Sequence, residues 1–117
     1  MAAERLGLIA VIGEEAFVMG MLLAGVGERT GEGNTNFFVV DANTHKDDVV
    51  LAFEEFLERP DVSLILVSQF LLERDLKQSV QRLPSAAPPV VGVPSSEFPY
   101  RPQQDPLVQL VSAKVFR

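Results

Sequence analysis

Residues 6–28, LGLIAVIGEEAFVMGMLLAGVGE, decide the fold of this chain. They open with an apolar run at 8–12 that shows almost no alternation, which is typical of a strand buried on both faces of a parallel sheet. Gly13 ends the run, and Glu14 and Glu15 open a helix, because carboxylates are favourable at the positive end of the helix dipole. The helix is apolar nearly all round, so its second face needs a cover.

The rest of the chain repeats this unit of strand, turn and helix. Apolar runs predict strands at 36–40, 62–67 and 90–93. Apolar residues at helical spacing predict helices at 46–59 and 71–83. Because each helix lies between two strands, the pattern indicates βαβ units with right-handed crossovers. We therefore expect an α/β fold with a four-stranded parallel sheet in the flavodoxin-like order 2-1-3-4.

Local start and stop signals support these boundaries. Gly25 stops the first helix, as glycines commonly do just after a helix end. Thr44, with Asp47 three residues on, resembles a capping box at the start of the second helix. Pro60 ends that helix because proline cannot donate the next backbone hydrogen bond. The sequence thus predicts helix ends independently of the apolar pattern.

The chain changes character after residue 93. Residues 94–106, PSSEFPYRPQQDP, hold four prolines in thirteen positions, which is too many for regular structure. Pro106 then makes a good first-turn residue for a short amphipathic helix, and a helix of this length is marginal alone in water. We divide the chain into an α/β domain (1–93), a proline-rich tether (94–106) and a C-terminal helix (107–117). We expect the helix to move relative to the α/β domain and to lie outside its core in the isolated chain.

Composition and charge restrict the class of protein. A length of 117 residues suits one domain, and the absence of cysteine excludes disulfides and thiolate metal sites. We expect no signal or transit peptide, and no apolar run approaches the roughly 20 residues of a membrane-spanning helix. Residues 1–75 hold 14 acidic and 5 basic side chains, whereas residues 76–117 hold 2 and 5. An acidic body repels nucleic acid and anionic membrane, so a protein partner suits it better.

The first turn argues against a nucleotide site. Phosphate binding there needs glycine N–H groups that face the anion, whereas the carboxylates of Glu14 and Glu15 repel it. A phosphoacceptor receiver domain shares this topology, and these two acids would serve as its acidic pair. The third strand, however, ends in Val67, Ser68 and Gln69, where a receiver has its Asp. The fourth strand also lacks the Lys that a receiver has at its end.

No catalytic or metal-binding constellation is visible. His45 is the only histidine, and without a second ligand nearby it predicts no metal site. Ser95, Ser96 and Tyr100 have no base within reach in the sequence, and a catalytic triad cannot be built around one histidine in a turn. We therefore predict no catalytic residue, no cofactor and no metal.

Several phrases of the sequence together resemble the F subunit of the vacuolar-type ATPases, in its eukaryotic form. They are, in chain order, IGEE at 12–15, GMLLAGVGE at 20–28, NFFVV at 36–40, LILVSQ at 64–69, VPSS at 93–96 and PY at 99–100. The resemblance covers essentially the whole chain and rests on the order and spacing of these motifs. It implies a non-catalytic rotor part of the central stalk. In this family, the F subunit pairs with the coiled-coil D subunit, which turns inside the A/B catalytic head and couples ATP hydrolysis to proton transport.

The resemblance also implies where the partner binds. The stalk coiled coil would contact the apolar side of the C-terminal helix, formed by Leu107, Leu110, Val111, Val115 and Phe116. The chain would then be cytoplasmic and peripheral, held through the complex on the cytosolic face of a proton-pumped membrane such as that of the vacuole, with no direct membrane insertion. One alternative stays open: a stand-alone flavodoxin-like module, either a degenerate receiver or a small-ligand binder.

Overall fold

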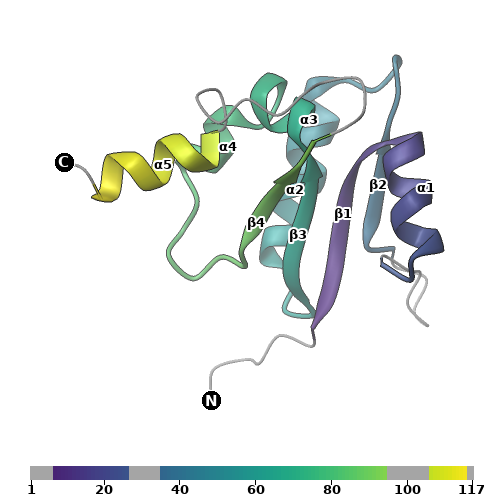
Figure 1. Ribbon diagram of the computed structural model, residues 1–117, viewed down its shortest axis with the longest axis horizontal. Helices are drawn as coiled ribbons and strands as arrows, with labels where there is room; N and C mark the ends of the chain where they lie inside the picture. The colour runs from purple at the N-terminus through teal and green to yellow at the C-terminus, as the bar shows by residue number, and fades with distance from the viewer. Residues whose placement is uncertain (1–6, 27–34, 95–105, 116–117) are drawn as a thin grey trace.

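The computed structural model describes residues 7–26, 35–94 and 106–115 of the 117. Its strands are β1 (Leu8–Glu14), β2 (Phe37–Val40), β3 (Val62–Ser68) and β4 (Val90–Val93). They form one four-stranded sheet in the order β2-β1-β3-β4, and every pair is parallel (Figure 1). The predicted α/β fold and strand order are confirmed.

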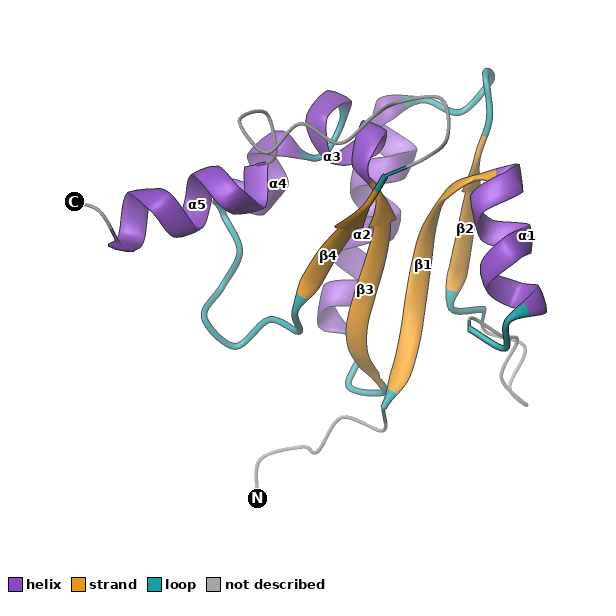
Figure 2. Ribbon diagram, in the orientation of Figure 1, coloured by secondary structure: helices purple, strands orange, loops and turns teal. Residues whose placement is uncertain are grey.

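Helices lie on both faces of this sheet (Figure 2). They are α1 (Glu15–Leu23), α2 (Lys46–Glu58), α3 (Gln69–Arg74), α4 (Lys77–Gln81) and α5 (Pro106–Val115). On one face, α1 lies against β1 and β2, while α2 and α3 cover the other face. The last helix, α5, lies beyond β4 and contacts α4 and β4. The two faces of the sheet are therefore covered unequally.

The main core lies between the sheet and the α2–α3 layer. Phe53 of α2 is fully buried there, together with Ile12 and Ile65 from the two central strands. Val11 and Val18 are also fully buried but lie outside this cluster, on the side of α1. Because neighbouring residues of a strand point to opposite faces, each continuous apolar run places side chains both in the main core and on the face that α1 covers.

The connection between β3 and β4 differs from the prediction of one helix at 71–83. It contains two short helices, because the carbonyl of Leu71 accepts hydrogen bonds from the N–H groups of both Asp75 (2.9 Å) and Leu76 (3.0 Å). Because one carbonyl accepts both hydrogen bonds, the regular hydrogen-bond pattern of the helix is interrupted and α3 ends there. The turn buries Leu76 fully and leaves Asp75 only 6% exposed. Arg74 balances the buried carboxylate with two hydrogen bonds of 2.9 Å each.

The predicted capping box at Thr44 is wrong. The hydroxyl of Thr44 donates to Asp41 Oδ1 at 3.1 Å and accepts from the Asp41 N–H at 3.0 Å, so it stabilises the preceding turn. His45 occupies the N-cap position of α2 without a side-chain cap bond. The stop signal at Gly25, in contrast, is confirmed: its φ of +88° is a conformation that glycine adopts readily.

Candidate interaction surfaces

The carboxyl edge of the sheet is where α/β proteins of this topology commonly bind ligands. There the hydroxyl of Ser68 donates to Glu14 Oε1 at 3.1 Å. The other oxygen of the Glu14 carboxylate is buried and has no hydrogen-bond partner among the described residues. A cavity of about 300 Å³ beside it is also lined by Asp41, Phe70 and Arg74. A carboxylate at this position opposes the binding of a phosphate.

The acidic pair that a receiver domain requires is not assembled at this edge. Glu14 ends β1 next to Ser68, whereas Glu15 is exposed in the first turn of α1. Arg74, which also lines this cavity, donates hydrogen bonds to Asp75, and these bonds raise the pKa of its guanidinium. Within the described ranges, no three His, Cys, Asp or Glu side chains lie together as a metal-binding group.

The outward side of α1 is an apolar surface. Val18 is the one residue of this helix that is buried, while Met19 is 50% exposed and Leu23 is 85% exposed. The expectation that this helix cannot bury all of its apolar side chains is confirmed. The same face of the sheet continues over Leu66 and Val91, which are register partners, and Val91 is 43% exposed. No described helix covers this half of the face.

The C-terminal helix α5 has one side on the body and one side in solvent. Leu107 and Leu110 are half-buried and pack against the main core cluster. The expectation that this helix lies outside the core is corrected for these two residues. Val111 is 57% exposed and Val108 is 38% exposed. Of the remaining predicted interface residues, the side chain of Val115 and the whole of Phe116 lie outside the described part of the chain.

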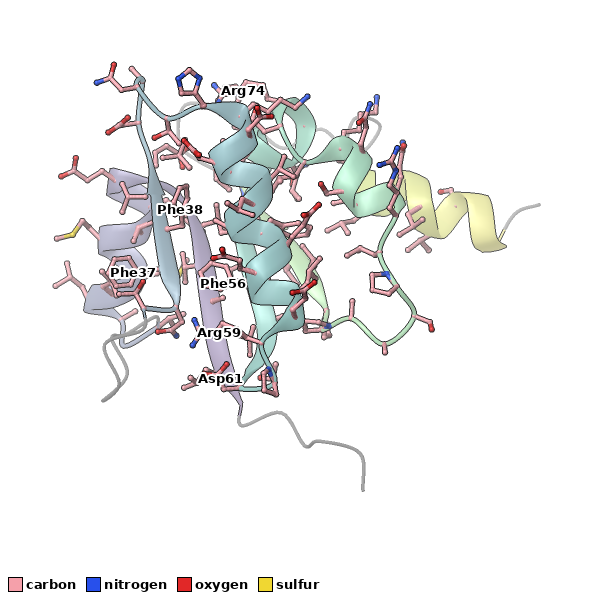
Figure 3. All side chains as sticks on the ribbon, turned by 180° about the vertical axis from the view of Figure 1, so that it is seen from behind. Phe37, Phe38, Phe56, Arg59, Asp61 and Arg74 are labelled. Carbon is pink, nitrogen blue, oxygen red and sulfur yellow. The ribbon has the colours of Figure 1, made fainter. Side chains whose placement is uncertain are left out.

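An open groove runs between the edge strand β2 and the helix α2, with a volume of about 1030 Å³. Its apolar lining includes Phe38 from the strand and Leu51 and Phe56 from the helix. Figure 3 shows Phe38 and Phe56 on the α2 side of the molecule. The groove also has acidic residues, which are Asp41, Asp48, Glu55 and Glu58. Its lining therefore combines apolar side chains with four carboxylates.

One end of this groove is closed by an arginine clasp, which we define as Arg59, Asp61 and Thr35. The guanidinium of Arg59 donates to both carboxylate oxygens of Asp61, at 3.0 and 2.7 Å, and to the carbonyl of Thr35 at 2.7 Å. It also lies 5.8 Å from the centre of the Phe56 ring. The hydrogen bonds from Arg59, together with its charge, lower the pKa of Asp61. The clasp joins the end of α2 to the starts of β2 and β3.

The sequence did not reveal the groove or the clasp. Arg59 and Asp61 are neighbours that any surface turn could hold, and Thr35 is 24 residues from Arg59. Their contact depends on β2 lying at the edge of the sheet with α2 crossing behind it. The available signal was indirect: an edge strand in the predicted order, followed by a helix with several acidic residues.

The comparison with known proteins gives a family. Residues 9–111 match the family model described as ATP synthase (F/14-kDa) subunit. The chain belongs to this family.

Its relatives include proteins named as the F subunit of the V-type proton ATPase in several eukaryotes. The protein from Homo sapiens is 36% identical over 107 residues, which cover 92% of this chain and 89% of the relative. The protein from Vanderwaltozyma polyspora is 34% identical over 114 residues and 95% of each chain. The protein from Dictyostelium discoideum is 36% identical over 98 residues, which cover 84% and 81%. The resemblance found in the sequence motifs is confirmed.

In the described ranges, none of the helices has the length and apolar character needed to cross a bilayer.

Proposed function

We propose that this chain is a non-catalytic part of the central stalk of a V-type rotary ATPase, where it pairs with the coiled-coil D subunit and helps couple ATP hydrolysis to proton transport. The observation that carries the proposal is the family match over residues 9–111, together with relatives named as the F subunit of the V-type proton ATPase along nearly their whole length. The chain would then work on the cytosolic face of a proton-pumped membrane, attached through the other subunits of the complex, including the A/B catalytic head.

The surfaces of the molecule support a role in assembly. The outward side of α1 leaves Met19 and Leu23 at least half exposed, and contiguous exposed apolar surface commonly marks an interaction site. The outer side of α5 leaves Val108 and Val111 in solvent as well. A coiled coil presents a long apolar seam of the kind that such surfaces complement.

Within α5, the predicted interface residues divide into two roles. Leu107 and Leu110 face the body and fix the position of the helix. Val111 faces away and is free to enter a partner's groove. Val115 and Phe116, the other two predicted interface residues, belong to the proposed contact as the sequence predicts it. The partner would thus contact a helix that the body already holds in place, which lowers the entropy cost of binding.

A matched pair of substitutions tests this proposal. Val111→Asp places a charge on the outer side of α5, and Ser112→Asp places the same charge at an exposed neighbour. We expect Val111→Asp to lower the affinity for the D subunit at least tenfold, with thermal unfolding unchanged, and Ser112→Asp to have a smaller effect. The affinity is measured by calorimetry with the purified D subunit. Equal and near-native affinities of both variants would contradict the assignment of this interface.

The alternative, a stand-alone small-ligand module, has one observation in its favour. A buried oxygen of Glu14, beside the cavity of about 300 Å³, has no hydrogen-bond partner in the part of the chain that the structure describes. Purification from the native source separates the two functions. A stalk component co-purifies with other ATPase subunits, whereas a ligand module is recovered alone with a small molecule bound.

A further inference from the structure

The strand β2 presents an open edge. It stands at the end of the order β2-β1-β3-β4, and its only described strand partner is β1. The backbone N–H of Val11 in β1 donates to the carbonyl of Asn36, and Val11 lies opposite Phe37 in the strand register. In a parallel ladder this register directs the N–H groups of Phe37 and Val39 away from β1. The edge is short and apolar, FFVV, and it carries none of the lysines or prolines that usually protect an edge strand.

A strand added at this edge would run along the groove between β2 and α2. On the α2 side, its side chains would cover Phe38 and meet the acidic residues of the groove, among them Asp48 and Glu55. On the other side they would cover Val39, which is 38% exposed. Because side chains alternate along a strand, the complementary segment alternates basic residues with apolar residues.

The charge around the groove selects among possible occupants. Four carboxylates line it, and the single arginine among its lining residues, Arg59, has both oxygens of Asp61 bound to its guanidinium. A second copy of this chain, paired edge to edge through β2, would bring two such acidic grooves together and is disfavoured by their repulsion. A basic segment gains attraction at the same positions.

We propose that the β2 edge is a docking site for an extended basic segment of a partner protein, which adds to the sheet as a fifth strand beside α2. This surface is separate from the outer side of α5, so the inference does not depend on the proposed stalk contact. The partner is defined by its chemistry: lysines or arginines at alternate positions, with apolar or other β-branched residues between them.

A synthetic peptide tests the proposal on the full chain. The probe is a nine-residue peptide, KVKTKVKTK, with blocked ends and a fluorescent label, and its binding is followed by fluorescence anisotropy. We expect saturable binding at one site, and no binding of the acidic peptide EVETEVETE. Removing two groove charges with Asp48→Asn and Glu55→Gln should weaken binding about fivefold, because each exposed charge pair contributes only modestly. The matched control neutralises Asp47 and Glu54, which lie elsewhere on α2 and do not line the groove.

The geometry of pairing is tested separately from the charge. Val39→Pro removes the outward N–H and leaves the bonds to β1 intact, since proline is tolerated on an open strand edge. We expect this variant to lose binding and to keep its circular dichroism and melting temperature. In the native chain, the peptide should slow the amide exchange of Phe37 and Val39.

Three results would overturn the proposal. The first is equal weakening by the groove pair and by the control pair, which would indicate a general charge effect. The second is unchanged amide exchange of Phe37 and Val39 at saturating peptide. The third is a chain that sediments as a dimer and whose two copies pair through this edge, which would make a second copy the occupant.

Discussion

Replacing Arg59 by methionine should destabilise the fold by an amount that the contacts of the clasp allow us to estimate. The change keeps an unbranched stem near Phe56 and removes the two hydrogen bonds to Asp61 and the one to the carbonyl of Thr35. Bonds to charged groups contribute about 1.5–3 kcal/mol when buried, whereas exposed ion pairs contribute about 0.2–1 kcal/mol. The two side chains are 21% and 23% exposed, so we place the total loss at about 2 kcal/mol.

The effect should be visible in thermal unfolding. A loss of 1 kcal/mol lowers the melting temperature of a domain of this size by about 4 °C, so Arg59→Met should melt about 8 °C lower. The exposed Arg82, replaced in the same way, should change the melting temperature by less than about 2 °C. A double-mutant cycle with Asp61→Asn should return a coupling energy near 1 kcal/mol. Additive effects of the two changes would refute the view that the clasp acts as a unit.

The clasp also predicts a pH dependence. The hydrogen bonds and charge of Arg59 lower the pKa of Asp61 in the folded chain below its unfolded value of about 3.9. The ionised carboxylate therefore stabilises the fold above about pH 4, and this contribution is lost as the pH falls through the lowered pKa. The difference in unfolding free energy between the native chain and Asp61→Asn should be constant from about pH 5 to 7 and shrink below about pH 4. A difference that grows on acidification would contradict the cause assigned to the shift.

Three glycines predict different effects of substitution by alanine. A Cβ at Gly20 meets no atom within 4 Å, so Gly20→Ala should stabilise α1 by about 0.5–1 kcal/mol. Gly25 has a φ of +88°, so Gly25→Ala should destabilise the helix by about 1 kcal/mol. Urea titration of both variants checks that the two effects have opposite signs. At Gly92 a Cβ would collide with the side-chain oxygen of Gln69 and lie 2.5 Å from Leu72 Cδ1. Gly92→Ala should therefore lower the free energy of unfolding by about 1–3 kcal/mol. A near-native urea midpoint would show that the two side chains move aside freely.

The strands were predictable because the evidence for them is local. Each is a run of β-branched and aromatic residues bounded by turn residues, and the alternation of strands with helices leaves few possible topologies. For the flavodoxin-like order 2-1-3-4, the right-handed crossovers then determine which face of the sheet each helix covers. The apolar excess of α1 was equally readable, since its composition alone shows that one face cannot cover it.

The features that escaped prediction depend on competition between side chains. Leu72, Leu76 and Val80 recur every four residues and predict one helix, yet the helix breaks where the carbonyl of Leu71 accepts two hydrogen bonds. Thr44 has the sequence context of a helix cap, but the nearby carboxylate of Asp41 holds its hydroxyl. The docking of α5 required knowing which side of β4 remains open. None of these contacts is set by local spacing.

The place of β1 in the sheet has a consequence for synthesis of the chain. This first strand pairs with β3, and the hydroxyl of Ser63 donates to the carbonyl of Leu8, 55 residues away in the sequence. At about 5–20 residues per second, several seconds separate the emergence of these two strands from a ribosome. During that interval β1, which lies in the most apolar stretch of the chain, lacks β3, the strand that pairs with it on the side away from β2. The newborn chain should therefore be most prone to aggregation, and most in need of a chaperone, before β3 emerges, and much less so afterwards.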